Sequence, residues 1–265
     1  MDYLLYLSLG AVAGLISGLF GLGGGVVIVP ILILAFEFQG MAPEISTHVA
    51  IGTSLATILV TSLTSIYTHQ QKRAIRWDLV RYITPGIVLG ALLGGLVALS
   101  LRGTLLQLLF GGFLVLVALQ MLFYKPGIGT GSSPKPLLLS VAGTAIGGLS
   151  TLFGIGGGSL TTPFLTFNRV EIHHAVGSAA ACGFPIALAA TVIYATATIP
   201  SELMPASTLG YIFVPAWLGI IIASAPCARL GALLAHRTNA ALLQKLFGIL
   251  LLLLGGRFMW LNLPH

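Results

Sequence analysis

Two glycine-rich motifs of the same form are the residues of this sequence best suited to a binding site. The first glycine motif reads FGLGGGVVIVP, from Phe20 to Pro30, and the second reads FGIGGGSLTTP, from Phe153 to Pro163. Three successive glycines disfavour a straight helix, because each costs about 1 kcal/mol relative to alanine inside a helix. We therefore expect each run to break a helix and to expose N–H groups where the next helix starts. Such N–H groups, at the positive end of a helix dipole, bind anions.

The polar side chains near the motifs are hydroxyls, with no lysine or arginine in the middle of these stretches. A site without a fixed countercharge suits a transporter, because the anion must be released as well as bound. Two other interpretations stay open: the glycines could serve close helix packing, and membrane hydroxyls often bond to their own helix. The predicted substrate site consists of Gly23, Gly24, Gly25, Gly156, Gly157, Gly158, Ser159, Thr161, Thr53, Ser54 and Ser178.

Other glycine pairs have a spacing that is typical of helix packing in membranes. Gly14 with Gly18, Gly90 with Gly94 and Gly143 with Gly147 are each four residues apart. This spacing places small residues on one helix face, where two backbones can approach closely. For these pairs we expect a packing role rather than a binding role.

Two histidines are candidates for proton coupling. His48 and His173 start equivalent apolar segments, 125 residues apart, and imidazole changes charge near neutral pH. Polar residues at the membrane interface are the alternative reading, and sodium is the alternative coupling ion. The sequence has no HExxH pattern or paired carboxylates, and Cys182 and Cys227 lack a metal-binding or disulfide spacing. We therefore expect no catalytic residue, no metal site and no cofactor.

The composition indicates an integral membrane protein. Hydrophobic residues make up 57% of the 265, charged residues only 7%, and the mean hydropathy is +1.03. A soluble domain has about a quarter of its residues charged. The net charge of +6 does not indicate nucleic acid binding, because the basic residues sit in short breaks between apolar segments. The expected surroundings are the lipid bilayer, crossed several times.

The chain reads as two related halves. A linker, 125–136, separates an N-terminal transmembrane repeat, 1–124, from a C-terminal one, 137–265, and AIGTS from Ala50 is echoed by AVGSA from Ala175. The second segment of each half is too short for the roughly 20 residues that a membrane span needs. The predicted apolar segments are 4–20, 25–37, 48–69, 79–100 and 104–124, then 136–153, 158–168, 174–197, 207–228 and 239–262.

Charges at the segment ends predict that the halves are inverted. The segment 48–69 ends at Lys72 and Arg73, whereas its counterpart 174–197 ends near Glu202 with no base. Basic residues favour the cytoplasmic side, so the linker is expected to be cytoplasmic. We predict an all-α integral membrane protein with two inverted-topology repeats. Each repeat has a Gly-broken hairpin containing a short or half helix, plus three spanning helices, as in secondary transporters.

The motif GLFGLGGGVVIVP near the start, its echo after a central loop, and the chain length resemble the sulfite exporter TauE/SafE family. This resemblance covers essentially the whole chain. It implies a secondary transporter of the bacterial inner membrane that exports small sulfur-containing anions, such as sulfite or organosulfonates, by alternating access. A passive anion channel and a membrane-embedded enzyme are the alternatives. The second motif replaces valines of the first by Ser-Leu-Thr-Thr, so we expect an asymmetric site; the oligomeric state stays open.

Overall fold

The structure is a computed structural model, and it describes residues 2–20, 24–123, 135–198, 207–235 and 240–263. Apart from two strands of two residues each, its regular elements are α-helices. The elements are α1 Asp2–Phe20, α2 Gly25–Phe38, α3 Pro43–Gln71, α4 Trp77–Ser100, α5 Gly103–Phe123, α6 Pro136–Phe153, α7 Gly158–Phe167, α8 Ile172–Thr196, β1 Thr208–Leu209, β2 Ile212–Phe213, α9 Val214–Ala235 and α10 Ala240–Asn262.

The helix lengths agree with a protein that crosses the membrane several times. Within the described ranges, seven helices are long and apolar enough to span a bilayer: α3, α4, α5, α6, α8, α9 and α10. The helices that follow the two glycine motifs are shorter, with 14 residues in α2 and 10 in α7. The all-α membrane fold and the short second segment of each half are thereby confirmed.

One predicted segment begins later than expected. The sequence predicts one apolar segment at 207–228, and within it α9 starts only at Val214. The preceding residues form a β-hairpin that pairs Thr208 with Phe213 and Leu209 with Ile212. The N–H of Tyr211 in this hairpin donates to the carbonyl of Tyr194 on α8. These external hydrogen bonds replace helical ones, and apolar periodicity does not register them.

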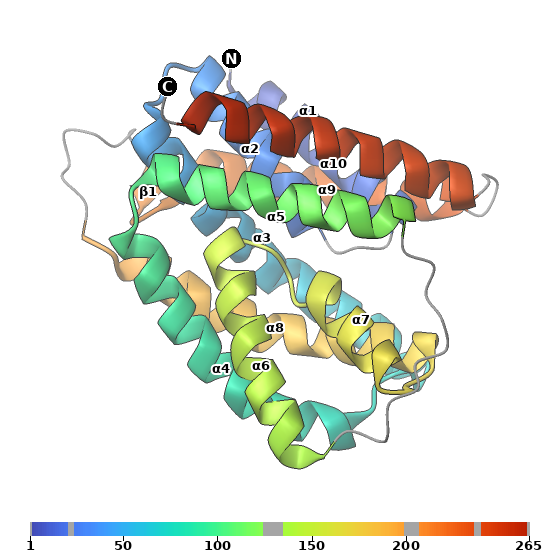
Figure 1. Cartoon of the computed structure of the whole chain (residues 1–265). Coiled ribbons are helices and arrows are strands. Elements are labelled where there is room, and N and C mark those ends of the chain that lie inside the picture. The colour runs from blue at the N-terminus through green and yellow to red at the C-terminus, as the bar shows by residue number, and fades with distance from the viewer. Residues whose placement is uncertain (1, 21–23, 124–134, 199–206, 236–239, 264–265) are drawn as a thin grey trace.

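The helices pair across the two halves of the chain. Helix α1 packs on α9, α4 on α6, α5 on α10, and α3 on α8. Figure 1 shows α5 and α10 running side by side, and α4 beside α6. Each pair therefore takes one helix from each half, so the halves share an extensive interface.

Several contacts in these pairs bring a glycine of one helix against the backbone of its partner. A Cβ placed on Gly10 would lie 2.7 Å from the Cα of Ile220, and one on Gly143 would overlap the carbonyl of Ile83. The same holds for α5 and α10, where Gly111 and Gly255 each approach the other's carbonyl oxygen. Close approach of this kind requires glycine, since any Cβ would collide with backbone.

The glycines predicted to serve packing lie at such contacts. Gly14 meets the backbone of Ser224, Gly90 that of Thr144, Gly94 that of Gly148, and Gly147 that of Ile87. The surroundings of Gly18 are not described by the structure. At Gly14, Gly90, Gly94, Gly143 and Gly147 the packing interpretation is therefore correct.

The equivalent helices α3 and α8 run antiparallel. A Cβ on Gly52, early in α3, would meet Tyr194 at the end of α8 at 3.1 Å. At the other end, a Cβ on Gly177 near the start of α8 would lie 2.6 Å from the carbonyl oxygen of Ala74, just beyond the end of α3. At each end of the bundle, the start of one of these helices therefore lies beside the end of the other.

Candidate functional site

The two glycine motifs meet in the interior of the protein. A Cβ on Gly25, the first residue of α2, would lie 2.6 Å from the Cα of Ile155 and 3.0 Å from the amide nitrogen of Gly156. Helix α2 is buried along Val26, Val27, Ile28, Val29 and Pro30. Residues 154–157 of the second motif are buried as well, so this non-helical backbone is not exposed to lipid. The expected approach of the motifs therefore occurs, with Gly25 and Ile155 at the point of contact.

A left-handed turn ends α6 at the second motif. Gly154 has φ of +66° and caps α6, a conformation that glycine adopts without the penalty of a Cβ. Its carbonyl oxygen accepts a hydrogen bond of 2.8 Å from the Oγ of Ser54 on α3. The predicted site residue Ser54 therefore binds the second motif from the opposite half of the chain and does not bond to its own helix.

Both motifs lie near the middle of the long helices beside them. A Cβ on Gly156 would lie 3.5 Å from Ile58 of α3, and one on Gly157 would lie 2.9 Å from Ile186 and 3.5 Å from the nitrogen of Gly183. Ile58 is central in Pro43–Gln71, and Gly183 is central in Ile172–Thr196. Helices of this length cross the hydrocarbon core, so the break at the second motif lies at membrane depth.

Some polar groups of the second motif have no hydrogen-bond partner in the part of the chain that the structure describes. Across the described ranges, no backbone carbonyl accepts from the N–H groups of Gly156, Gly157 or Gly158. The Oγ1 of Thr161 is fully buried and makes no hydrogen bond there, and it would lie 3.4 Å from a Cβ on Gly157. Buried polar groups are nearly always paired, so this group of donors and the hydroxyl is suited to a polar ligand.

Two predicted hydroxyls form matching hydrogen bonds between the halves. The Oγ1 of Thr53 accepts from the N–H of Phe213 at 3.0 Å, and the Oγ of Ser178 accepts from the N–H of Arg76 at 2.9 Å. Thr53 and Ser178 occupy equivalent positions in AIGTS and AVGSA. Thr53 accepts from the residue before α9, and Ser178 accepts from the residue before α4, so each bond joins the two halves. Both hydroxyls thus hold α3 and α8 to neighbouring segments.

Two further predicted site residues, Gly24 and Ser159, lie at the starts of the short helices α2 and α7. Gly24 precedes α2, and its carbonyl accepts from the N–H groups of Val27 and Ile28. Ser159 lies half-buried in the first turn of α7. Gly23 falls outside the described residues, so its predicted role keeps the status of a sequence prediction.

The two histidines of the equivalent pair have different environments. His48 is 4% exposed, and its Nδ1 and Nε2 lie 3.2 and 3.0 Å from the carbonyls of Glu44 and Ala98. The side chain of His173 is 59% exposed and lies 3.5 Å from Glu171. The sequence predicted proton coupling for both histidines, but only the side chain of His48 is buried.

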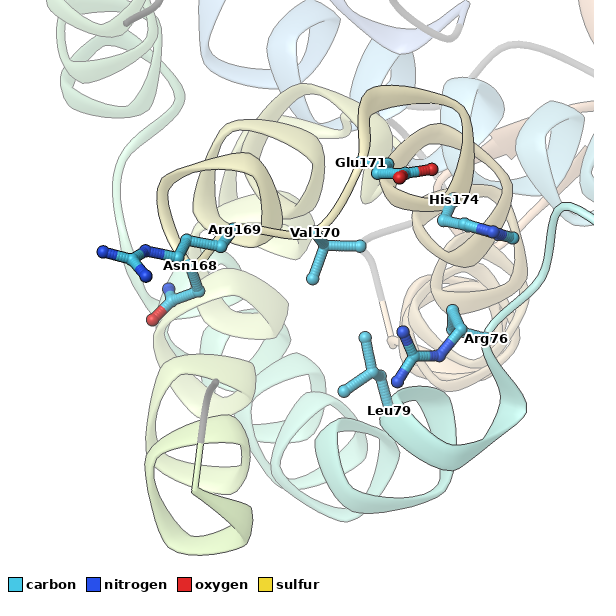
Figure 2. A pocket seen from close by; sticks show the side chains of 7 residues that line it. All are labelled: Arg76, Leu79, Asn168, Arg169, Val170, Glu171 and His174. Carbon is cyan, nitrogen blue, oxygen red and sulfur yellow. The ribbon is translucent and has the colours of Figure 1, made fainter. Parts of the chain in front are cut away.

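A cavity of about 430 Å³ lies where α7 ends and α8 begins, away from the glycine motifs. Figure 2 shows Glu171 and His174 across it from Arg76 and Leu79. The cavity is lined by Arg76, Leu79, Asn168, Arg169, Val170, Glu171 and His174. Arg76 forms a bidentate ion pair with Asp78 at 2.8 and 2.5 Å, and this partner raises the pKa of Arg76 above its usual value.

Comparison with known proteins agrees with this architecture. The model of the family described as sulfite exporter TauE/SafE matches residues 6–258. The chain belongs to the sulfite exporter TauE/SafE family. A "Probable membrane transporter protein" of Haemophilus influenzae is 36% identical over 250 residues, which cover 94% of this chain and 95% of that protein. A protein with the same description from Methanocaldococcus jannaschii is 28% identical over 264 residues, covering 96% of both chains.

No solved structure matches this TauE/SafE family chain closely enough to be significant. The family and its spanning helices make the chain a multi-pass bacterial membrane transporter with a small anionic substrate. The lipid bilayer is its surrounding medium, and family and relatives point to transport rather than to an enzyme.

Sequence reasoning missed two hydroxyls and the cavity in this TauE/SafE family member. Ser150 and Thr151, at the end of α6, are fully buried, and their hydroxyls have no partner among the described residues. Their position directly before the second motif is a signal that the sequence already contained. The cavity was missed because Arg76 and Arg169 are far apart in sequence and come together only through the packing of α4 on α8.

Proposed function

We propose that the protein exports sulfite, or a closely related sulfur-containing anion such as an organosulfonate, by alternating access. The observation that carries this proposal is the contact of the two glycine motifs at membrane depth, beside the buried hydroxyl of Thr161 and N–H groups for which the described residues supply no backbone acceptor. Sulfite offers several oxygen acceptors to such donors. Amides and hydroxyls bind these oxygens without the strong attachment that a lysine or arginine would add.

Alternating access requires two states of the protein, each open to one side of the membrane. We assign the exchange between these states to two inverted repeats. The antiparallel course of α3 and α8 supports this assignment. So do the close contacts between the halves, such as Gly10 with Ile220 and Gly143 with Ile83. A twofold relation in the membrane plane lets one half move relative to the other around a central site.

The anion is proposed to bind beside the N-terminus of α7. The N–H groups of Gly157 and Gly158 point from the first turn of this helix, where the dipole contributes about half a positive charge. Thr161 adds a hydroxyl that can donate to a sulfite oxygen. The hydroxyls of Ser150 and Thr151, which have no partner among the described residues, lie at the end of α6 directly before the second motif.

The contact between Gly25 and Ile155 is proposed to change during transport. Their backbones touch in this structure, so an anion cannot pass between them here. Access from one side then requires α2 to move relative to the second motif. In this proposal the contact acts as the closed gate on one side of the anion.

The cavity beside Arg76 and Arg169 is proposed as the cytoplasmic vestibule. Basic residues Lys72, Arg73 and Arg76 place this end of α3 and α4 on the cytoplasmic side by the positive-inside rule. The lining has two arginines, Arg76 and Arg169, and one carboxylate, Glu171, and an excess of positive side chains raises the local concentration of anions. For an exporter this is the side from which the substrate is collected.

Proton coupling is proposed for His48 alone. A neutral imidazole donates from one nitrogen, whereas both ring nitrogens of His48 face carbonyl oxygens. The protonated ring can donate to both carbonyls, and the neutral ring to one. The ring of Tyr211 lies 5.2 Å away, and coupling to sodium is the competing outcome.

Counterflow in proteoliposomes tests the function. Vesicles loaded with sulfite should take up radiolabelled sulfite faster than empty vesicles. Excess sulfate or sulfoacetate should compete with this uptake, and the anion that resembles the substrate more should compete more strongly. Taurine, which is zwitterionic, serves as the control. Uptake that is independent of sulfite on the opposite side would indicate a channel, and conversion of sulfite would indicate an enzyme.

A further inference from the structure

We propose that Glu171, His173 and His174 bind a divalent transition metal ion at the start of α8. The possible ligand atoms of these three residues lie within 4.8 Å of one another. The rings of the two histidines have centroids 4.0 Å apart, and Nδ1 of His173 is 3.5 Å from a carboxylate oxygen of Glu171. The sequence analysis expected no metal site, because these residues match no metal-binding pattern.

The donor set selects the kind of metal. Two imidazoles and one carboxylate suit Zn²⁺ and neighbouring transition metals rather than Ca²⁺ or Mg²⁺, which prefer oxygen ligands. Three protein ligands leave a fourth position for water. Glu171 precedes the helix with an extended backbone, ψ of 141°, so its side chain is not confined to the helical spacing and lies beside that of His173.

One of the ligands is already oriented by the protein. Nδ1 of His174 lies 3.1 Å from the carbonyl oxygen of Ala74. A carbonyl can only accept, so Nδ1 carries the proton and Nε2 keeps its lone pair. This arrangement, in which one ring nitrogen donates to a carbonyl and the other binds metal, is typical of histidine ligands.

A metal here would change the charge of the adjacent cavity. Glu171 and His174 also line that cavity, together with Arg76 and Arg169, and Glu171 is the carboxylate of the lining. A bound dication would neutralise Glu171 and make the rim more positive. If the cavity is the vestibule of the proposed transporter, on which this consequence rests, metal should strengthen anion binding there.

Metal binding is measured on the full chain in detergent, with its purification tag removed and residual metal stripped by a chelator. Titration calorimetry with Zn²⁺ alone should give about one ion per chain. His173→Gln, an exposed position that should fold normally, and Glu171→Gln should each weaken binding by about tenfold or more, the scale of damage at a metal site. His69→Gln, a histidine outside the cluster, is the matched control.

The metal titration decides the proposal for the site. Loss of affinity in the His173 and Glu171 variants, with normal binding in the His69 variant, supports it. Absence of Zn²⁺ binding, or equal binding in all variants, overturns it. Co²⁺ absorption gives a second readout, since its visible spectrum reports the ligands and should change in His174→Gln.

The coupling to anions is tested separately with sulfite titrations at zero and saturating Zn²⁺. Sulfite affinity should rise several-fold with Zn²⁺ in the unmodified chain and stay constant in His173→Gln. If Zn²⁺ binds but sulfite affinity does not change, the coupling is wrong and the metal site stands. If sulfite does not bind under either condition, the proposed function fails and the metal titration is unaffected.

Discussion

Gly25 and Ile155 are in direct backbone contact, with only 2.6 Å between the Cα of Ile155 and the position of a Cβ on Gly25. These residues belong to different halves of the chain, and each lies inside one of the two glycine motifs. The contact joins the start of α2 to the turn after α6 near the middle of the long helices. A binding site and a moving contact at this point would affect both halves at once, which is what a transporter requires.

The first prediction concerns this contact. Gly25→Ala adds a Cβ that collides with backbone rather than with a movable side chain, so we expect sulfite counterflow to fall at least about tenfold. Gly112→Ala is the matched control, because a Cβ there meets nothing within 4 Å; it should retain transport and gain up to about 1 kcal/mol of helix stability. Near-normal transport by the Gly25 variant would show that the contact does not take part in the cycle.

The second prediction separates binding from stability at Thr161. Thr161→Val removes a buried hydroxyl without a described partner and keeps the shape of the side chain. We expect the ligand-free protein to be equally stable or more stable, by about 1–2 kcal/mol, since an unpaired group is removed. Sulfite affinity should fall by about 1–3 kcal/mol, measured by calorimetry.

The control for Thr161 is Thr57→Val. The buried hydroxyl of Thr57 donates to the carbonyl of Thr53 in its own helix, so its loss should leave sulfite affinity unchanged. Equal sulfite affinity in the Thr161 variant and the unmodified chain would remove Thr161 from the site.

The third prediction concerns inversion. In a background with Cys182 and Cys227 replaced by alanine, cysteines at Gln71, the last residue of α3, and at Thr198, just beyond the end of α8, should be labelled from opposite sides. An impermeant maleimide should label Gln71→Cys only from the cytoplasmic side and Thr198→Cys only from outside. Both positions are exposed. Labelling of both from one side would exclude inverted repeats.

The fourth prediction concerns His48. Replacing His48 by Gln keeps one donor and removes the titration, so the pH dependence of transport should flatten while sulfite affinity stays nearly the same. His69→Gln, on the same helix, should keep the pH profile of the unmodified chain. An unchanged profile in His48→Gln would point to sodium or to no coupling ion, and replacement of sodium by potassium distinguishes these.

The fifth prediction concerns the vestibule. Arg76→Gln removes the charge but keeps the N–H that binds Ser178, so we expect the KM for cytoplasmic sulfite to rise by several-fold with little change in kcat. The difference should shrink at high salt, because screening weakens electrostatic attraction. Arg81→Gln is the control, since Arg81 stacks on Tyr82 outside the cavity. Equal KM values for both variants would contradict a role of the cavity in collecting anions.

Much of the fold could be predicted because the lipid bilayer restricts which sequences can cross it. Lipid requires long apolar helices, so composition and segment length were sufficient to place nearly every helix. Two short segments after the glycine motifs stood out for the same reason and are α2 and α7. The hairpin Thr208–Phe213 was missed because its apolar side chains resemble a helix start, while hydrogen bonds to Tyr194 and Thr53 hold its backbone in another form.

The sequence by itself determined the class of protein, the breaks at the two glycine motifs and the small residues at helix contacts, since each follows from local residue types in an apolar solvent. Only the tertiary structure decided which groups meet: Gly25 with Ile155, Ser54 with Gly154, and Arg76 with the cavity beside His174. It also separated His48 from His173, which the repeat made equivalent. Burial and partners depend on helices distant in the chain, and a repeat in sequence does not impose equal surroundings on its two copies.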